Sequence, residues 1–319
     1  MSVPSGPPEP PDPPDPPDLP DLPDLPDQPD LPPGYEPPRG LFEQWREAGP
    51  GVLVRRHRVL DLNVTLVLGR DRALVVDTHA HAGYAGALLA AVREITQLPL
   101  VAANTHAHFD HTFGNAVFAA QQPGLEIWAH AGCRAELERS GGRQRELAAG
   151  WFRDAGLEDD GQAVLDVEIV APNRTFAAAA ELDLGGRVVV LRHPGRGHTD
   201  HDVVVDVPDA GVTVTGDLVE EGAPPSFADA HPLDWPATLA ALLPRLQPVV
   251  VPGHGDLVDP GFVAAQRDDL AVVADAAAAL PSRVEEGDLL RAAAQLPVGR
   301  RAGLDALRRS VALRVPDQG

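Results

Sequence analysis

The chain is short of several residue types, and each shortage excludes a class of protein. Cys133 is the only cysteine among 319 residues, so an intramolecular disulfide and a cysteine-based zinc site are both excluded. Lysine is absent, and 26 arginines face 47 acids, a net charge of −21 that disfavours nucleic acid and anionic membranes as partners. No run of about 18 apolar residues occurs, so no segment is expected to span a bilayer.

The first residues, Met1 to Pro4, have neither a basic region nor an apolar run, and therefore no signal-peptide pattern. We expect a cytoplasmic protein. Hydrophobic residues make up 44% of the chain, which is enough to form a large core and excludes a fully disordered chain.

Residues 1–38 differ from the rest in composition. They hold 17 of the 34 prolines, 9 of the 47 acids and no base. An aspartate recurs at every third position from Asp12 to Asp30, always beside a proline, which matches the three residues per turn of polyproline II. We expect a disordered, solubilising tail, with a docking arm for an unknown partner as the alternative. Residues 39–319 contain the remaining 38 acids and 26 arginines, so their net charge is −12.

We expect residues 39–319 to form one domain. Short apolar runs between glycine or charged turns predict strands near 52–59, 63–68, 73–76, 98–103, 188–192, 202–207 and 212–215. Apolar residues at helical spacing predict helices near 83–97, 133–147, 235–243 and 263–279, and two more within 287–313. Strands and helices in each half predict a layered αββα sandwich. The C-terminal helices, from about 265, either cover a sheet or form a homodimer.

One stretch, Thr105 to His111, holds three histidines and an aspartate directly after an expected strand. In an extended backbone His106 and His108 project to the same side, because side chains alternate with period two. Asp110 and His111 lie beyond that pair, where a turn can aim them at a second point. Separate groups of ligands a few ångströms apart are what a two-metal site needs, and a solvated histidine-rich loop is the alternative.

Three single donors follow at the ends of other expected strands. His198 lies in a glycine-rich turn, Asp217 follows Thr215 and Gly216, and His254 lies between two glycines. Loops at the ends of strands in a layered sheet can converge on one place, so we expect these donors to join the histidine motif.

The pattern His-x-His-x-Asp-His, followed by single His, Asp and His, resembles the metallo-β-lactamase-fold hydrolase superfamily over roughly residues 50–260. The resemblance implies the α/β fold of that superfamily, a four-layer αββα sandwich. It also implies two metal sites. The implied ligands are His106, His108 and His198 for the first metal, Asp110, His111 and His254 for the second, and Asp217 as a bridge. Asp77 matches an early aspartate that orients a ligand histidine.

Five imidazoles and two carboxylates suit zinc, and iron or manganese also accepts such donors. Two divalent ions that share a water lower its pKa and yield a hydroxide nucleophile at about pH 7. Asp110 would orient that hydroxide and pass its proton to the leaving group. The resemblance thus predicts a hydrolase of a small-molecule ester, thioester or lactone-like substrate, with two Zn²⁺ ions as cofactors and Asp110 as the catalytic residue.

Details of the pattern separate the branches of the superfamily. The bridging Asp217 resembles glyoxalase II-like and lactonase-like members, whereas β-lactamases of this fold often have cysteine there. Lactonase-like members also use a tyrosine that neither Tyr35 nor Tyr84 matches in position. Three alternatives stay open: a mononuclear iron persulfide dioxygenase, a β-lactam hydrolase, and a non-catalytic binding protein.

Seven of the 12 histidines fall outside this ligand set. We expect structural roles for the three in or beside strand-like segments, His57, His130 and His193. His79 and His81 either have structural roles or line the cleft, and His201 is expected to be an exposed loop residue. Residues 220–235 follow Asp217, and we expect this acidic, proline-containing stretch to shape the substrate pocket.

Overall fold

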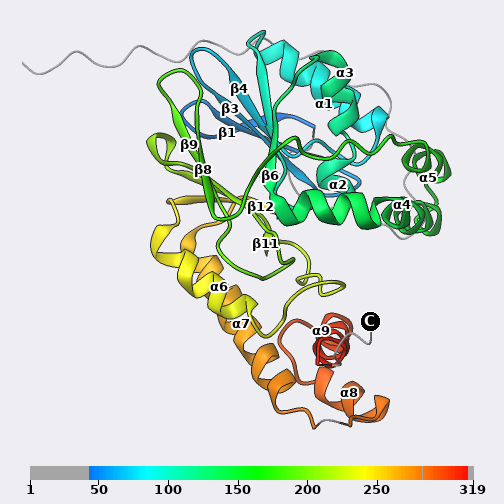
Figure 1. The fold of residues 1–319 in the computed structure, drawn as a ribbon. Helices are drawn as coiled ribbons and strands as arrows, with labels where there is room; N and C mark the ends of the chain where they lie inside the picture. The colour runs from blue at the N-terminus through cyan, green and yellow to red at the C-terminus, as the bar shows by residue number, and fades with distance from the viewer. Residues whose placement is uncertain (1–42, 282, 315–319) are drawn as a thin grey trace, which may run out of the picture.

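The computed structural model describes residues 43–281 and 283–314, and Figure 1 shows two sheets with helices outside them. The predicted tail, residues 1–38, lies outside the described residues. The division of the chain into a tail and one domain therefore stays a prediction. Among the described helices, none is both long enough and apolar enough to cross a membrane.

The first sheet has seven strands that follow one another in chain order. They are β1 (Trp45–Gly49), β2 (Val52–Arg56), β3 (Asn63–Leu68), β4 (Ala73–Val76), β5 (Leu100–Ala103), β6 (Ile127–His130) and β7 (Arg174–Phe176). Strands β4 to β7 run parallel, and β4 and β5 are buried along their whole length because both of their faces are covered. Val76 pairs with Ala103, so the two strands end level and the next residues start loops on one edge.

The second sheet has five strands in the order β12-β11-β10-β9-β8. They are β8 (Ala179–Asp183), β9 (Val188–Arg192), β10 (Val204–Val207), β11 (Val212–Glu220) and β12 (Val249–His254). Only β11 and β12 pair in parallel, and their register places Gly216 opposite Pro252. The register also pairs Glu220 with His254, so the two strands end side by side.

Helices cover the outer face of each sheet. Those of the first half are α1 (Ala82–Ile95), α2 (Phe109–Thr112), α3 (Asn115–Gln121), α4 (Ala131–Asp154) and α5 (Glu158–Leu165). Those of the second half are α6 (Trp235–Leu242), α7 (Pro260–Ala278), α8 (Glu286–Ala293) and α9 (Arg300–Ala312). In Figure 1 the two sets lie on opposite sides of the sheets.

The core forms three apolar layers. A valine-rich layer, which includes Val54, Val101, Leu191 and Val205, lies between the sheets. A second layer packs α1 and α4 on the first sheet, and a third packs α6, α7 and α9 on the second. The predicted αββα sandwich is confirmed. The C-terminal stretch forms two helices, as expected, and they cover the second sheet's side of the molecule.

Candidate metal centre

A buried carboxylate, Asp77, holds the loop that carries the histidine motif. It accepts hydrogen bonds from the backbone N–H and the hydroxyl of Thr105, both at 2.8 Å, and lies 2.8 Å from Nδ1 of His111. Its backbone φ of 66° lies in the left-handed region, which is uncommon for residues other than glycine and persists where the surroundings determine it. The aspartate that the resemblance placed beside a ligand histidine thus contacts His111.

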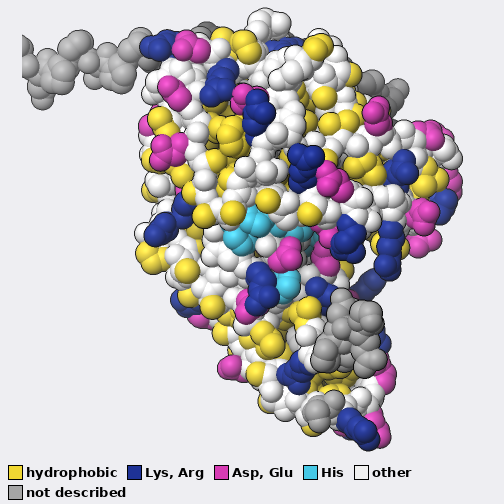
Figure 2. Space-filling model, in the orientation of Figure 1, with side chains coloured by type: hydrophobic (Ala, Val, Ile, Leu, Met, Phe, Trp, Pro, Cys, Tyr) yellow, Lys and Arg dark blue, Asp and Glu magenta, His cyan; other side chains and the backbone are white. Residues whose placement is uncertain are grey.

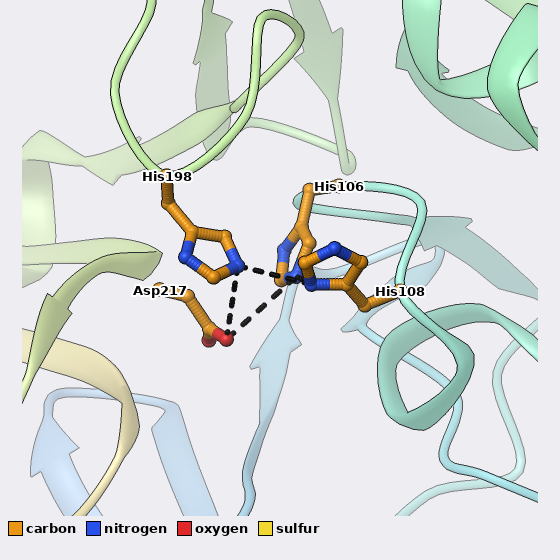
Figure 3. Close-up of side chains that lie close together, drawn as sticks. All are labelled: His106, His108, His198 and Asp217. Carbon is orange, nitrogen blue, oxygen red and sulfur yellow. Dashed lines mark hydrogen bonds and ion pairs between the residues drawn. The ribbon is translucent and has the colours of Figure 1, made fainter. Parts of the chain in front are cut away.

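Four of the predicted donors meet at one point (Figure 3). The Nε2 atoms of His106 and His198 lie 2.9 and 3.0 Å from Nδ1 of His108. Oδ2 of Asp217 lies 3.7 Å from Nε2 of His106 and 3.5 Å from Nε2 of His198. One ligand atom from each residue lies within 4.8 Å of the others. The loop after β5, the β9–β10 loop and strand β11 therefore converge here.

Contacts on the outer side of the rings determine which nitrogens carry hydrogen. Nδ1 of His106 lies 3.1 Å from the hydroxyl of Thr105, whose own hydrogen goes to Asp77. Nε2 of His108 lies 3.0 Å from Oδ2 of Asp229. These contacts assign a hydrogen to each outer nitrogen, so the inner nitrogens of the neutral rings are bare. Two bare nitrogens then face each other across 2.9 Å, which is repulsive unless a cation or a proton lies between them.

The other three predicted donors meet at an adjoining point. Oδ2 of Asp110 lies 3.4 Å from Nε2 of His254 and 3.6 Å from Nε2 of His111. Nδ1 of His254 lies 2.9 Å from the carbonyl oxygen of Leu60, and Nδ1 of His111 meets Asp77. Both rings therefore turn Nε2 towards the centre of the group.

Asp217 lies between the two groups. Its Oδ1 is 3.3 Å from Nε2 of His111, and its Oδ2 is 3.4 Å from Nε2 of His254. Gly253 makes room for this carboxylate, because a Cβ at residue 253 would lie 1.8 Å from Oδ1. All seven predicted donors thus come together in two adjoining groups, while their role as metal ligands stays a prediction.

The directions of the pKa shifts differ between the groups. Burial lowers the pKa of His106 well below its usual value and also lowers the pKa of His198. Burial acts the same way on His111 and His254, but the neighbouring aspartates outweigh it: they raise the pKa of His111 well above normal and that of His254 to about 10. A cation entering the second group has to displace protons, so its affinity should depend on pH.

Orphaned polar atoms provide a test of whether these residues fit a metal. Among the described residues, Nε2 of His111, Nδ1 of His198 and Oδ1 of Asp217 are buried without a hydrogen-bond partner. Buried polar atoms are normally satisfied, and each exception needs an explanation. Nε2 of His111 and Oδ1 of Asp217 face each other inside the cluster, where a divalent cation would satisfy both. Imidazole and carboxylate donors are those that zinc accepts, so the residues present fit two metal ions.

Two residues that no motif reveals support this centre. Asp229 holds the outer nitrogen of His108, and it outweighs burial to raise the pKa of His108 to about 9. Arg309, in α9, donates hydrogen bonds to the carbonyl oxygens of Asp229 and Ala230, both at 2.9 Å. Residue 229 lies inside the stretch that we expected to shape the pocket, but no spacing in the sequence links it to residue 108.

The prediction that His201 is an exposed loop residue is wrong, because only 3% of it is exposed. Its Nε2 accepts a hydrogen bond from the backbone N–H of Ala107 at 3.2 Å, and its Nδ1 lies 2.7 Å from Oδ1 of Asp200. The His201 ring therefore holds the backbone between His106 and His108 in place. The flanking aspartates look like those of a solvated turn, which is why the sequence misleads here.

Two further histidines that were candidates for the cleft have structural roles. His79 packs against His57 and Tyr84, with ring centroids 4.3 and 5.0 Å apart. His81 caps α1: its Nδ1 accepts a hydrogen bond from the backbone N–H of Gly83, and its Nε2 lies 3.1 Å from Asp160.

His57 should make the stability of the protein depend on pH. Burial is the main cause that lowers its pKa from 6.5 to about 3. Between these values the unfolded chain binds a proton that the folded chain excludes. The free energy of unfolding should therefore fall as the pH drops below about 6.5, by about 1 kcal/mol per pH unit from this residue.

Urea unfolding in EDTA, near pH 7 and near pH 5, measures this effect. His57→Gln should reduce the difference in the free energy of unfolding between the two pH values. His193→Gln, which changes a histidine that does not contact His57, should preserve that difference. An unchanged pH dependence in His57→Gln would contradict the assignment.

Comparison with known proteins gives a consistent result. A family model described as the metallo-beta-lactamase superfamily matches residues 57–281. A metallo-beta-lactamase type 2 from Bacillus sp. (strain 170) is 27% identical over 164 residues, which are 50% of this chain and 52% of the relative. Another, from Bacillus cereus, is 31% identical over 97 residues, 29% of this chain and 38% of the relative. The chain thus spans about half, or less, of the length of these relatives.

Solved structures also resemble this one. A metallo-beta-lactamase from Pontibacter korlensis superposes with a TM-score of 0.58 at 21% identity, covering 72% of this chain and 98% of the other. A likeness at this identity shows a shared fold.

Proposed function

Because the chain belongs to the metallo-beta-lactamase superfamily, we propose that it is a dinuclear, metal-dependent hydrolase of small esters, thioesters or lactone-like compounds. The observation that carries this proposal is the convergence of seven donors in two adjoining groups. The inward-facing nitrogens of His106 and His108, 2.9 Å apart, support a cation at this point.

Each group of donors would hold one metal ion. His106, His108 and His198 would hold one ion, Asp110, His111 and His254 would hold the other, and Asp217 faces both. Zinc, when bound there, would lower the pKa of a water molecule and polarise the substrate carbonyl. Thr105, Asp77, Asp229 and Leu60 hold the outer nitrogens of His106, His111, His108 and His254, so four of the five rings are oriented before any ion arrives.

Asp110 is the side chain best placed to move a proton. In the reaction, the oxygen of water bonds to the carbonyl carbon, and the bond from that carbon to the leaving oxygen or sulfur breaks. A carboxylate oxygen of Asp110 would accept the proton of the water and then donate it to the leaving atom. The Asp110 side chain is 12% exposed, between His254 at 18% and Asp217 at 7%.

Substrate would approach from the side of His108 and His254. Their side chains are 24% and 18% exposed, whereas those of His106, His111 and His198 are exposed by 1% or less. The exposure of these two side chains supports a small molecule as the substrate. Figure 2 shows one face of the molecule, on which histidine side chains lie at the surface with acidic and arginine side chains around them.

A β-lactam hydrolase is the second candidate. The names of the two curated relatives favour it, since both are metallo-beta-lactamases. β-Lactamases of this fold often have cysteine at the position of Asp217. This aspartate therefore favours a hydrolase of esters, thioesters or lactone-like compounds instead.

Metal content and substrate range test the proposal together. Protein purified without added metal should contain close to two equivalents of zinc per chain by plasma mass spectrometry. It should hydrolyse a chromogenic thioester or lactone faster than a chromogenic cephalosporin, and the reverse order would select the second candidate. One equivalent of iron per chain, with oxygen uptake on addition of a persulfide, would identify the protein as a persulfide dioxygenase instead of a hydrolase.

A further inference from the structure

A cavity of about 660 Å³ lies outside the ligand set of the metal centre. Residues 224–228, which follow β11, form one wall, and α9 forms the other. This volume is within the range of small-molecule sites. Ala228 in the first wall precedes Asp229, whose Oδ2 lies 3.0 Å from Nε2 of His108. The segment that forms one wall of this cavity, the α9 pocket, therefore continues directly into the residue that contacts His108.

The α9 wall is basic although the chain is acidic. The chain carries a net charge of −21, yet residues 300–314 contain five arginines and a single acid, Asp305. Three of these arginines, Arg301, Arg308 and Arg309, line the pocket. The local excess of positive charge favours an anionic ligand.

The three arginines differ in how far they are already engaged. Arg309 donates to the carbonyl oxygens of Asp229 and Ala230. Arg308 pairs with Glu286 and lies 4.0 Å from Asp305, the carboxylate in the same wall. Arg301 is exposed, and within the described ranges 43–281 and 283–314 no carboxylate pairs with it. Arg301 is therefore the cation whose donors are open to a ligand.

The rest of the lining, with Pro224, Pro225, Ala302 and Ala312, suits an apolar chain. A guanidinium binds a carboxylate through two parallel hydrogen bonds, which matches one free arginine. The superfamily match covers residues 57–281, so it includes the wall formed by residues 224–228 but not the wall formed by α9.

We propose that Arg301 in the α9 pocket binds a carboxylate of the substrate, so that preferred substrates carry a carboxylate separated by an apolar chain from the carbonyl that is hydrolysed. This assignment rests on the proposed hydrolase function for its kinetic part only, because binding to the pocket can be measured without turnover.

Direct binding is the first test. The zinc-loaded full chain is titrated by NMR with hexanoate and with hexanamide, its uncharged counterpart. Hexanoate should bind more tightly than hexanamide, and Arg301→Gln should weaken hexanoate by about fivefold, as for one partly exposed charged pair. Arg300→Gln, which removes a neighbouring arginine of α9 outside the pocket, should bind hexanoate like the wild type. Equal hexanoate affinity in all three proteins would overturn the proposal, since the carboxylate would then bind elsewhere, such as at the metals.

Turnover is the second test. The 4-nitrophenyl monoester of adipate carries a free carboxylate, and 4-nitrophenyl hexanoate has the same chain length without it. Arg301→Gln should raise KM for the adipate ester about fivefold more than for the hexanoate ester, and Arg300→Gln should not change this ratio. If the ratio of the two KM values is unchanged in Arg301→Gln, the α9 pocket does not bind the substrate carboxylate, even if hydrolysis is intact. If neither ester is hydrolysed, the proposed function fails for such esters, while the NMR titration still decides the pocket.

Discussion

Replacing Asp110 by asparagine should lower kcat by about 10³-fold, within the range expected when a general acid–base group is lost. The amide is the same size as the carboxylate but can neither accept the proton of water nor carry it to the leaving atom. It also weakens the second group of donors, where Oδ2 of Asp110 lies 3.4 Å from Nε2 of His254. The measurement is steady-state hydrolysis of the best thioester or lactone, with zinc at saturation and metal content recorded for each protein.

Asp234→Asn is the matched control for this substitution. Asp234 is a 43% exposed aspartate that pairs with Arg196 at 2.8 Å and belongs to neither group of donors. Its variant should keep the wild-type kcat. If Asp110→Asn turned over substrate at the wild-type rate with both metals bound, Asp110 would not be the proton carrier.

Removing metal should lower the melting temperature by about 10 °C. A ligand that binds only the folded state at a thousand times its Kd stabilises a protein by about 4 kcal/mol, and each kcal/mol shifts Tm by about 2–4 °C at this size. Calorimetry of zinc-loaded and EDTA-treated protein measures the shift.

Asp217→Asn should remove most of this metal-dependent shift, since Asp217 contacts histidines of both groups. Asp209→Asn, at a surface partner of Arg187, should retain it. The shift should also shrink at low pH, because protons held by His254, with its pKa raised to about 10, compete with the ion. Identical melting with and without EDTA at neutral pH would rule out a structural contribution from metal.

Much of the centre can be predicted from the sequence because its densest part is local. His106, His108, Asp110 and His111 share one loop. The alternation of side chains in an extended backbone, followed by a short turn, is enough to assign them to two groups of donors. The turn is the four-residue helix α2, which carries Asp110 and His111 away from the first pair. The single donor His198 could be placed because it follows the expected strand 188–192, and His254 because it lies between two glycines after an apolar run.

The parts that the sequence does not reveal depend on contacts between distant segments. Arg309 reaches Asp229, and Asp229 reaches His108, through a chain fold that no local pattern encodes. His201 lies among polar residues typical of a surface turn, and only the packing of its loop against Ala107 buries it.

Helix ends show the same limit. We predicted a helix over 133–147, and α4 runs over Ala131–Asp154 despite Gly141, Gly142 and Gly150. A Cβ at Gly141 would lie 2.7 Å from Ile169, so this glycine permits close packing rather than ending the helix. The exposed strands β7 and β8 were not predicted, because neither has the apolar alternation of a half-buried strand.

The donors come from both sheets, and the last of them, His254, ends the final strand. During synthesis the histidine motif leaves the ribosome long before this residue does. A nascent chain that has completed only the first sheet can therefore present the motif but completes neither group of donors, because His198, Asp217 and His254 are still missing. An ion held between the motif and His198, or between the motif and His254, would join the two halves across a long loop, and closure of such a loop comes late in folding. Acquisition of the full complement of metal would then mark the moment when the two halves of the molecule have docked.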